Sequence, residues 1–297
     1  MADATLSHKL PTHRELVYRH AVVTRITHWI NVVALLLLLM SGLQIFNAHP
    51  ALYWGERSTF DRPWLSMDAV DKGTYSIGVT RIGSASFVTT GLFGYSGRAG
   101  EQEPRGFPAW ATAPSYRALV DGRHWHFFFA WLFVLNGLTY LAGNLINGHV
   151  KRDLLLTKAD VQPRHVWHEI TEHARLRFPK GEEARRYNSL QKGAYLAVIF
   201  LILPLMVLTG LTMSPGVDAA LHWLLDLFGG RQSARTIHFL CAWTLVAFVL
   251  VHVAMVLVSG VFNNLRSMIT GKYAIEVPET PQPAAPEPGT PQQETPQ

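Results

Sequence analysis

Residues 236–262 read TIHFLCAWTLVAFVLVHVAMVLVSGVF. This stretch contains no Asp, Glu, Lys or Arg, and it exceeds the roughly 20 residues that a helix needs to cross a bilayer. It lacks strand-like alternation, and a bilayer core admits only helices or closed barrels. The stretch therefore predicts a membrane-spanning helix that carries two histidines, His238 and His252.

Three further segments share this character, at about 28–46, 126–146 and 194–213, and none of them contains a charged residue. Pro204 lies inside the third, where it removes one backbone hydrogen bond and predicts a kink. The predicted fold class is all-α: an integral membrane four-helix bundle with spans at about 28–46, 126–146, 194–213 and 236–262. A long outer loop, at about 47–123, connects the first two spans.

The composition agrees with a membrane protein and excludes several classes of site. The chain is 48% hydrophobic and 16% charged, with a mean hydropathy of +0.12, whereas soluble domains carry about a quarter charged residues. Its single cysteine, Cys241, excludes a disulfide framework, a thiolate zinc site and an all-cysteine iron–sulfur cluster. No C-x-x-C-H run exists for covalent haem attachment. The net charge of +5 without a basic block argues against nucleic acid as a partner.

Basic residues predict the orientation of the bundle. The segment before the first span has four Lys and Arg and the connection at about 150–193 has ten, whereas the turn between spans three and four has two. Because basic connections face the cytoplasm, both termini and the second connection are predicted to be cytoplasmic. Residues 1–275 form the predicted membrane domain, and 276–297 form a disordered Pro-rich tail. The outer loop is interpreted as a cap over the bundle, as a docking platform for a partner, or as both.

Four of the 14 histidines lie inside or at the edge of the spans: His28, His126, His238 and His252. Ionisable residues are rare in such helices and face the bundle interior, so each is a functional candidate. His238 and His252 are 14 residues apart, which places them within about 40° of one face and about 21 Å apart along the helix axis. With the predicted orientation, His28 lies at the inner depth of His252, and His126 lies at the outer depth of His238.

Two facing histidines at each of two depths can hold two haem groups, because electron-transfer haem iron takes two axial ligands from the protein. The predicted metal ligands are His28 with His252 and His126 with His238. Gly42 and Gly137 lie on the faces of His28 and His126 at the depth of the other haem, where they leave room for a porphyrin or for close helix packing. Arg25 and Arg235 lie at depths suited to haem propionates.

Other interpretations of these histidines stay open at this point. His28 and His126 could be interfacial anchors, and the histidines of the fourth span could belong to a proton path. His124 competes with His126 for the outer site, and His20 competes weakly with His28. The remaining histidines lie in tails or connections; three of them are weak candidates for proton uptake, namely His165, His168 and His173.

Four motifs carry a resemblance to a known family: RITHW (Arg25–Trp29), RHWHFFFAW (Arg123–Trp131), ARTIHFLCAW (Ala234–Trp243) and FVLVHVAM (Phe248–Met255). With them, about residues 18–275 resemble the bacterial di-haem cytochrome b subunits of the cytochrome b561 and nickel–iron hydrogenase type. The resemblance implies two haems b, ligated from spans one and four inside and from spans two and four outside. It also implies a location in the bacterial inner membrane.

The family's function implies that electrons pass between a periplasmic oxidoreductase, of the molybdopterin or hydrogenase type, and quinone or quinol in the bilayer. The long outer loop is similar to that of a branch that works with a molybdenum enzyme. The alternative is a stand-alone haem oxidoreductase that oxidises superoxide and reduces quinone, against which the loop argues because it would cover an open haem edge. A haem-free proton or ion carrier is the third class. No nucleophile–base constellation is visible, so we expect an electron-transfer subunit whose partner performs the substrate chemistry.

Overall fold

The computed structural model describes residues 12–98, 100–146, 148, 155–157, 160–175 and 189–278. Four helical stretches in this part are long and apolar enough to cross a membrane: α1 (Val22–Phe46), α2 (Leu119–Ile146), the stretch Ser189–Thr212 and α8 (Arg231–Val258). The structure thus has a candidate membrane-spanning helix at each of the four predicted spans. The first, second and fourth helices begin several residues before the uncharged runs and include charged residues, such as Arg25 and Arg235, near their starts.

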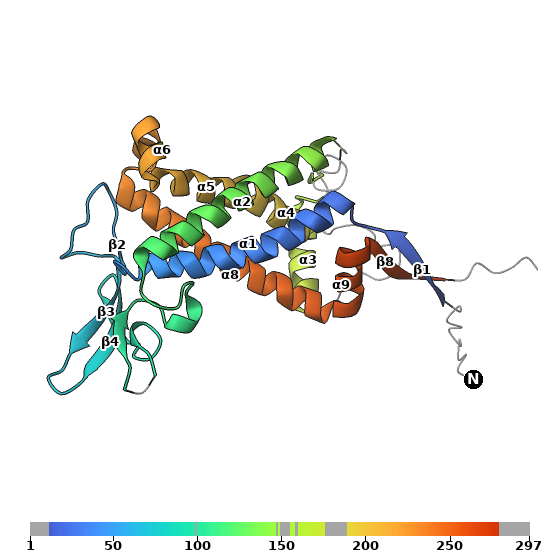
Figure 1. Ribbon diagram of the computed structural model, residues 1–297. Coiled ribbons are helices and arrows are strands. Elements are labelled where there is room, and N and C mark those ends of the chain that lie inside the picture. Colours follow the sequence, from blue (N-terminus) through green and yellow to red (C-terminus); the bar gives the residue numbers. More distant parts are fainter. Residues whose placement is uncertain are drawn as a thin grey trace, which may run out of the picture.

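The helices associate as two pairs (Figure 1). α1 packs along α2, and α5 (Leu203–Thr212) packs along α8. In the first pair, the buried Asn136 donates to the carbonyl of Thr27 at 2.8 Å and to Asn31 at 2.7 Å, because a polar side chain in such a helix needs a partner on its neighbour. This pairing sets which helix faces each histidine.

The third span is not a regular α-helix. It consists of α4 (Ser189–Ala197), a π-helical turn η4 (Val198–Ile202) and α5. Pro204 has no N–H, and its ring clashes with the carbonyl four residues earlier in an α-helix. The chain relieves this conflict by widening into the π turn directly before the proline. The irregularity predicted at Pro204 thus takes the form of a π turn.

The connection between α1 and α2 folds into a small domain, which we call the cap (residues 47–118). A four-stranded antiparallel sheet has the order β2 (Ala51–Leu52), β3 (Leu65–Asp71), β4 (Ser76–Ile82) and β5 (Ala85–Val88). A second ladder pairs β6 (Gly94–Ser96) with β7 (Glu103–Arg105), and the 3-10 helix η1 (Ala109–Ala111) follows. The all-α prediction therefore holds for the bundle and is wrong for this connection.

The cap packs onto one end of the bundle, which we call the cap end (Figure 1). Phe46 at the end of α1 shares a buried core with Leu52, Leu65, Met67 and Phe107 of the cap. Its ring also stacks on Phe239 of α8, with the ring centres 5.0 Å apart. The cap core is therefore continuous with two of the spans that carry the candidate histidines.

The opposite end of the bundle, the terminal end, holds both ends of the described chain (Figure 1). β1 (Thr12–Tyr18) and β8 (Lys272–Pro278) form a two-stranded antiparallel ribbon in which Tyr18 pairs with Lys272. α9 (Val261–Thr270) connects α8 to β8, and α3 (Pro163–Ala174) belongs to the connection between the second and third spans. Residues 276–278 of the predicted tail belong to β8, and its remainder, 279–297, lies outside the described residues.

Two short helices, α6 (Pro215–Ala220) and α7 (Trp223–Leu227), connect α5 to α8 at the cap end. Asp218 of α6 forms an ion pair with Arg231 in the first turn of α8. These short helices close the turn between the third and fourth spans.

Candidate functional site

The candidate site at the cap end consists of His126 on α2 and His238 on α8. Their ring centres lie 6.2 Å apart, with an angle of 64° between the ring planes. His124 is exposed on α2. The structure therefore brings His126, and not His124, to His238.

A second pair lies at the terminal end, formed by His28 of α1 and His252 of α8. Its ring centres are 6.4 Å apart, with an interplanar angle of 63°. Phe248 stacks on His252 one turn earlier in α8. The structure thus brings together both pairs that the depth argument predicted, and the role of the four histidines as haem ligands stays a prediction.

The two ring separations fit one metal ion between each pair. A metal–imidazole bond is about 2 Å long and the bonded nitrogen lies about 1.1 Å from the ring centre, so two imidazoles on opposite sides of one ion have centres roughly 6.3 Å apart. Among the described residues, no group of three or more His, Cys, Asp or Glu side chains could hold a metal ion. An iron with two imidazole ligands therefore needs its other ligands from a macrocycle, and the residues present fit a haem with two axial histidines.

At the cap end, each imidazole rests against a hydroxyl group of the neighbouring helix. Nδ1 of His126 lies 3.1 Å from Oγ of Ser41 on α1, and Nδ1 of His238 lies 3.1 Å from Oγ1 of Thr209 on α5. Nδ1 of His238 also donates to the carbonyl of Met206, at 3.1 Å. With Nδ1 engaged in this way, Nε2 of each ring is the nitrogen available to a metal.

Glycines follow these hydroxyl residues on both helices. A Cβ added to Gly42 would lie 3.3 Å from Cε1 of His126, and one added to Gly210 would lie 3.4 Å from Cε1 of His238. Gly42 therefore makes room for the His126 ring in this structure, and its predicted clearance for a porphyrin stays a prediction. Gly137 has open space where its side chain would be.

Ser41, Thr209 and Gly210 were missed by the sequence analysis. The signal that could have found them is a short repeat, Ser41-Gly42-Leu43 on the first span and Thr209-Gly210-Leu211 on the third. Both copies place a hydroxyl and a gap side by side on a helix, which is what an approaching imidazole requires.

The two arginines that were predicted near haem propionates bond to backbone carbonyls. Arg25 donates to the carbonyl of Ile269 in α9. Arg235 donates to the carbonyls of Ala51 at 2.9 Å and His49 at 2.5 Å, and so fastens the cap to α8. Their contact with propionates stays a prediction.

Polar side chains connect α3 to α4 at the terminal end. Asp160 accepts hydrogen bonds from Ser189 at 2.8 Å and Lys192 at 3.1 Å, and Nε2 of His165 lies 3.0 Å from Ser189. Hydrogen bonds from Thr157, Ser189 and Lys192 hold the pKa of Asp160 well below its usual range. His168 is exposed on α3, and the side chain of His173 lies outside the described residues. Their predicted part in proton uptake stays a prediction.

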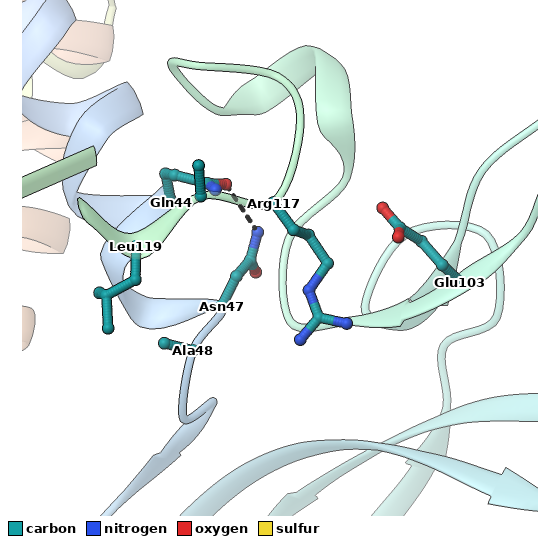
Figure 2. Close-up of a pocket in the computed structure, with 7 residues that line it drawn as sticks. Gln44, Asn47, Ala48, Glu103, Arg117 and Leu119 are labelled. Atoms are coloured by element: carbon teal, nitrogen blue, oxygen red, sulfur yellow. Dashed lines mark hydrogen bonds between the residues drawn. The ribbon is translucent and has the colours of Figure 1, made fainter. Parts of the chain in front are cut away.

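A pocket of about 420 Å³ lies where α1, the cap and α2 meet (Figure 2). Figure 2 shows Gln44 and Asn47 on its helix side and Arg117 and Glu103 on its cap side. Gln44 donates to the carbonyl of Tyr116 at 2.8 Å, and Asn47 accepts from the N–H of Phe107 at 2.6 Å. None of the four paired histidines lines this pocket, so it is separate from the imidazole sites.

Comparisons relate the chain to known proteins. The sequence pattern of the family described as Prokaryotic cytochrome b561 matches residues 19–271. A relative from Azospira oryzae, named as protein-methionine-sulfoxide reductase subunit YedZ1, is 28% identical over 258 residues, which are 87% of this chain and 98% of the relative. A second relative, from Cupriavidus necator and named as Ni/Fe-hydrogenase B-type cytochrome subunit, is 26% identical over 160 residues, which are 50% of this chain and 62% of that protein. No solved structure matches the chain with significant similarity.

Proposed function

The chain belongs to the prokaryotic cytochrome b561 family and is a membrane haem b electron-transfer subunit, and we propose that it binds two haems b and connects a periplasmic oxidoreductase with the quinone pool. The observation that carries the proposal is the pair of imidazole separations, 6.2 Å and 6.4 Å. Each separation matches one iron between two histidines, and α8 contributes one ligand to each pair.

The side chains of the bundle hold and orient the two cofactors. His126 and His238 present Nε2 to one site, since their Nδ1 atoms are engaged by Ser41, Thr209 and Met206. His28 and His252 form the second site, beside Phe248. A bound haem b supplies a one-electron iron couple whose potential depends on axial ligands, hydrogen bonds and burial. The two ligands on α8 lie about 21 Å apart along the helix, so the sites are distributed across the membrane.

The proposed orientation of the bundle in the membrane follows from the distribution of Lys and Arg residues. The terminal-end segments carry most of the Lys and Arg residues outside the cap, so this end faces the cytoplasm and the cap faces the periplasm of the inner membrane. The oxidoreductase partner then docks at the cap, and quinone exchanges electrons near His28 and His252. The names of the two relatives, a subunit of methionine-sulfoxide reductase and a hydrogenase subunit, support an oxidoreductase partner. That this partner depends on molybdenum is part of the proposal and rests on the long connection that forms the cap.

Haem content per chain tests the proposal. We expect two haems b in the wild-type protein and one in either His238→Ala or His28→Ala, because each variant removes one axial ligand of one site. His124→Ala is the matched control and should keep both haems, since its side chain is exposed beside the site. A wild-type protein without a reduced b-type absorption band, or a His238→Ala variant with unchanged haem content, would contradict the proposal.

Co-purification tests the partner. A pull-down from membranes with the intact cap should recover a periplasmic oxidoreductase, and quinol should reduce that partner only through the wild-type chain. Recovery of the chain alone, with full superoxide-dependent quinone reduction, would instead establish a stand-alone enzyme.

A further inference from the structure

We propose that Ser41 and Thr209 are positioning residues that fix the cap-end histidines for iron, and that Ser41 lowers the midpoint potential of the haem held there. The inference rests on the proposed function, because it assumes a haem between His126 and His238. It concerns hydroxyl groups of α1 and α5 that the ligand motifs do not contain.

The hydrogen bonds of Ser41 determine which nitrogen of His126 carries the proton. The hydroxyl of Ser41 has a single hydrogen, and it lies 2.6 Å from the carbonyl of Leu37, which can only accept. The hydroxyl oxygen must then accept at its contact with Nδ1 of His126, at 3.1 Å. Nδ1 is therefore protonated, and Nε2 is left with the lone pair that an iron needs.

The same arrangement holds His238. The hydroxyl of Thr209 donates to the carbonyl of Leu205 at 2.7 Å, so its oxygen accepts from Nδ1 of His238. Nδ1 of His238 also lies 3.1 Å from the carbonyl of Met206. The ring of His126 likewise hydrogen-bonds to the carbonyl of Leu38, so each imidazole has one hydroxyl and one carbonyl partner.

Both hydroxyl residues are fully buried, with 0% of their surface exposed. Water therefore cannot replace the hydrogen bonds if the hydroxyl groups are removed. Gly42 and Gly210 leave the gap through which the rings reach the hydroxyl groups, since a Cβ there would lie 3.3 Å and 3.4 Å from the imidazole carbons. The hydroxyl and the neighbouring glycine together form a fitted seat for each ring.

These hydrogen bonds affect the iron through its ligands. An Nδ1–H that donates to an oxygen makes the imidazole a stronger electron donor, which stabilises ferric iron and lowers the midpoint potential. For His28 and His252, no comparable hydroxyl or carbonyl contact to a ring nitrogen is found within the described ranges. The effect of Ser41 should accordingly fall on one of the two haem potentials.

Redox titration of the full-length protein, with the two haems resolved by their spectra, tests the inference. We expect Ser41→Ala to shift the ferrous-to-ferric ratio of one haem five- to tenfold toward ferrous iron at a fixed potential, which is roughly 40–59 mV for a one-electron couple. Ser41→Thr should restore the wild-type potential, because it keeps a hydroxyl at the same place. Thr209→Val should shift the ratio of the same haem in the same direction, since the hydroxyl of Thr209 accepts from the other axial ligand, His238.

Thr139→Val is the matched control, because Thr139 also bonds the carbonyl four residues earlier on α2 but its hydroxyl faces no imidazole. Two retained haems and unchanged potentials in Ser41→Ala would overturn the inference and leave the proposed function intact. Loss of the cap-end haem in Ser41→Ala, with retention in Ser41→Thr, would support it; loss in both variants would overturn it. Absence of that haem from the wild-type protein would instead contradict the proposed function itself.

Discussion

Gly42→Ala should weaken binding of the haem proposed at the cap end without disturbing the haem proposed at the terminal end. The added methyl carbon would lie 3.3 Å from Cε1 and 3.6 Å from Nδ1 of His126. Carbon atoms prefer about 3.5–4.0 Å, so the ring must retreat by roughly 0.2–0.7 Å. Metal–ligand distances tolerate only about ±0.2 Å, and the ring cannot retreat that far and keep both its iron bond and its contact with Ser41.

The expected loss of haem affinity follows from the effect of comparable substitutions at groups that orient metal ligands. Such changes weaken metal binding about 10- to 100-fold, which is roughly 1.4–2.8 kcal/mol. We expect the cap-end haem to transfer to an excess of apomyoglobin correspondingly faster, while the terminal-end haem stays bound. Gly210→Ala should act in the same direction but less strongly, since its Cβ would lie 3.4 Å from the ring of His238.

Gly193→Ala is the control for the loss of a helix glycine. Gly193 lies in α4, and nothing lies within 4 Å of its added Cβ. If Gly42→Ala retains the cap-end haem as tightly as Gly193→Ala does, the fitted contact between α1 and the His126 ring has no part in haem binding. The reasoning from ring position to affinity would then be refuted.

Three other predictions concern the remaining parts of the molecule. Gly137→Leu should reduce terminal-end haem content with the helical content unchanged. Nothing lies near an added Cβ at Gly137, and a leucine side chain would fill the space that we predict a porphyrin to occupy. Two bound haems in the purified variant would contradict this. Arg235→Met removes the guanidinium that donates to the carbonyls of His49 and Ala51, which should loosen the cap by about 2–4 kcal/mol and speed proteolysis within residues 47–118, whereas Arg231→Met, which removes an ion pair between α6 and α8 outside the cap, should not. Burial and Arg235 lower the pKa of His49 below its ordinary 6.5, against the opposing effect of Asp68, so the cap should keep full stability above about pH 6.5 and lose it as the pH falls toward the lowered pKa. His49→Gln should flatten this dependence in a proteolysis series, and an unchanged profile would argue against it.

The spans and the histidine pairs could be predicted because they depend on local sequence. An uncharged run of about 20 residues is a physical requirement of the bilayer, and the 100° turn per residue fixes the face that carries His238 and His252. The same geometry gives the depth of Gly42 on α1 but does not show which residue of another helix lies against it. The structure places His126 of α2 there, because α1 packs along α2.

The seats of the imidazoles were harder to predict. Serine and threonine in helices commonly bond the carbonyl four residues earlier, as Ser41, Thr209, Thr139 and Thr244 all do. Only the packing of α2 on α1 and of α8 on α5 singles out the first two as partners of histidine. A sequence contains the hydroxyl groups but does not show which helix lies beside them.

The strands of the cap were missed for a different reason. Leu65–Asp71 and Ser76–Ile82 are separated by a short turn in which Gly73 has a φ of +87°. Windows of about 20 residues, which suit membrane helices, average over such short elements. The pairing of β1 with β8 joins segments at opposite ends of the chain, and no local pattern predicts a contact of that sequence separation.

The β1–β8 ribbon shows, independently of hydropathy, that the number of membrane crossings is even. Its strands form a continuous ladder from Thr12 paired with Pro278 to Tyr18 paired with Lys272, and such hydrogen bonds cannot connect strands on opposite sides of a bilayer. Everything between residues 18 and 272 must therefore cross the membrane an even number of times. Two reporters fused to the chain ends would share one compartment, whichever way the bundle is inserted.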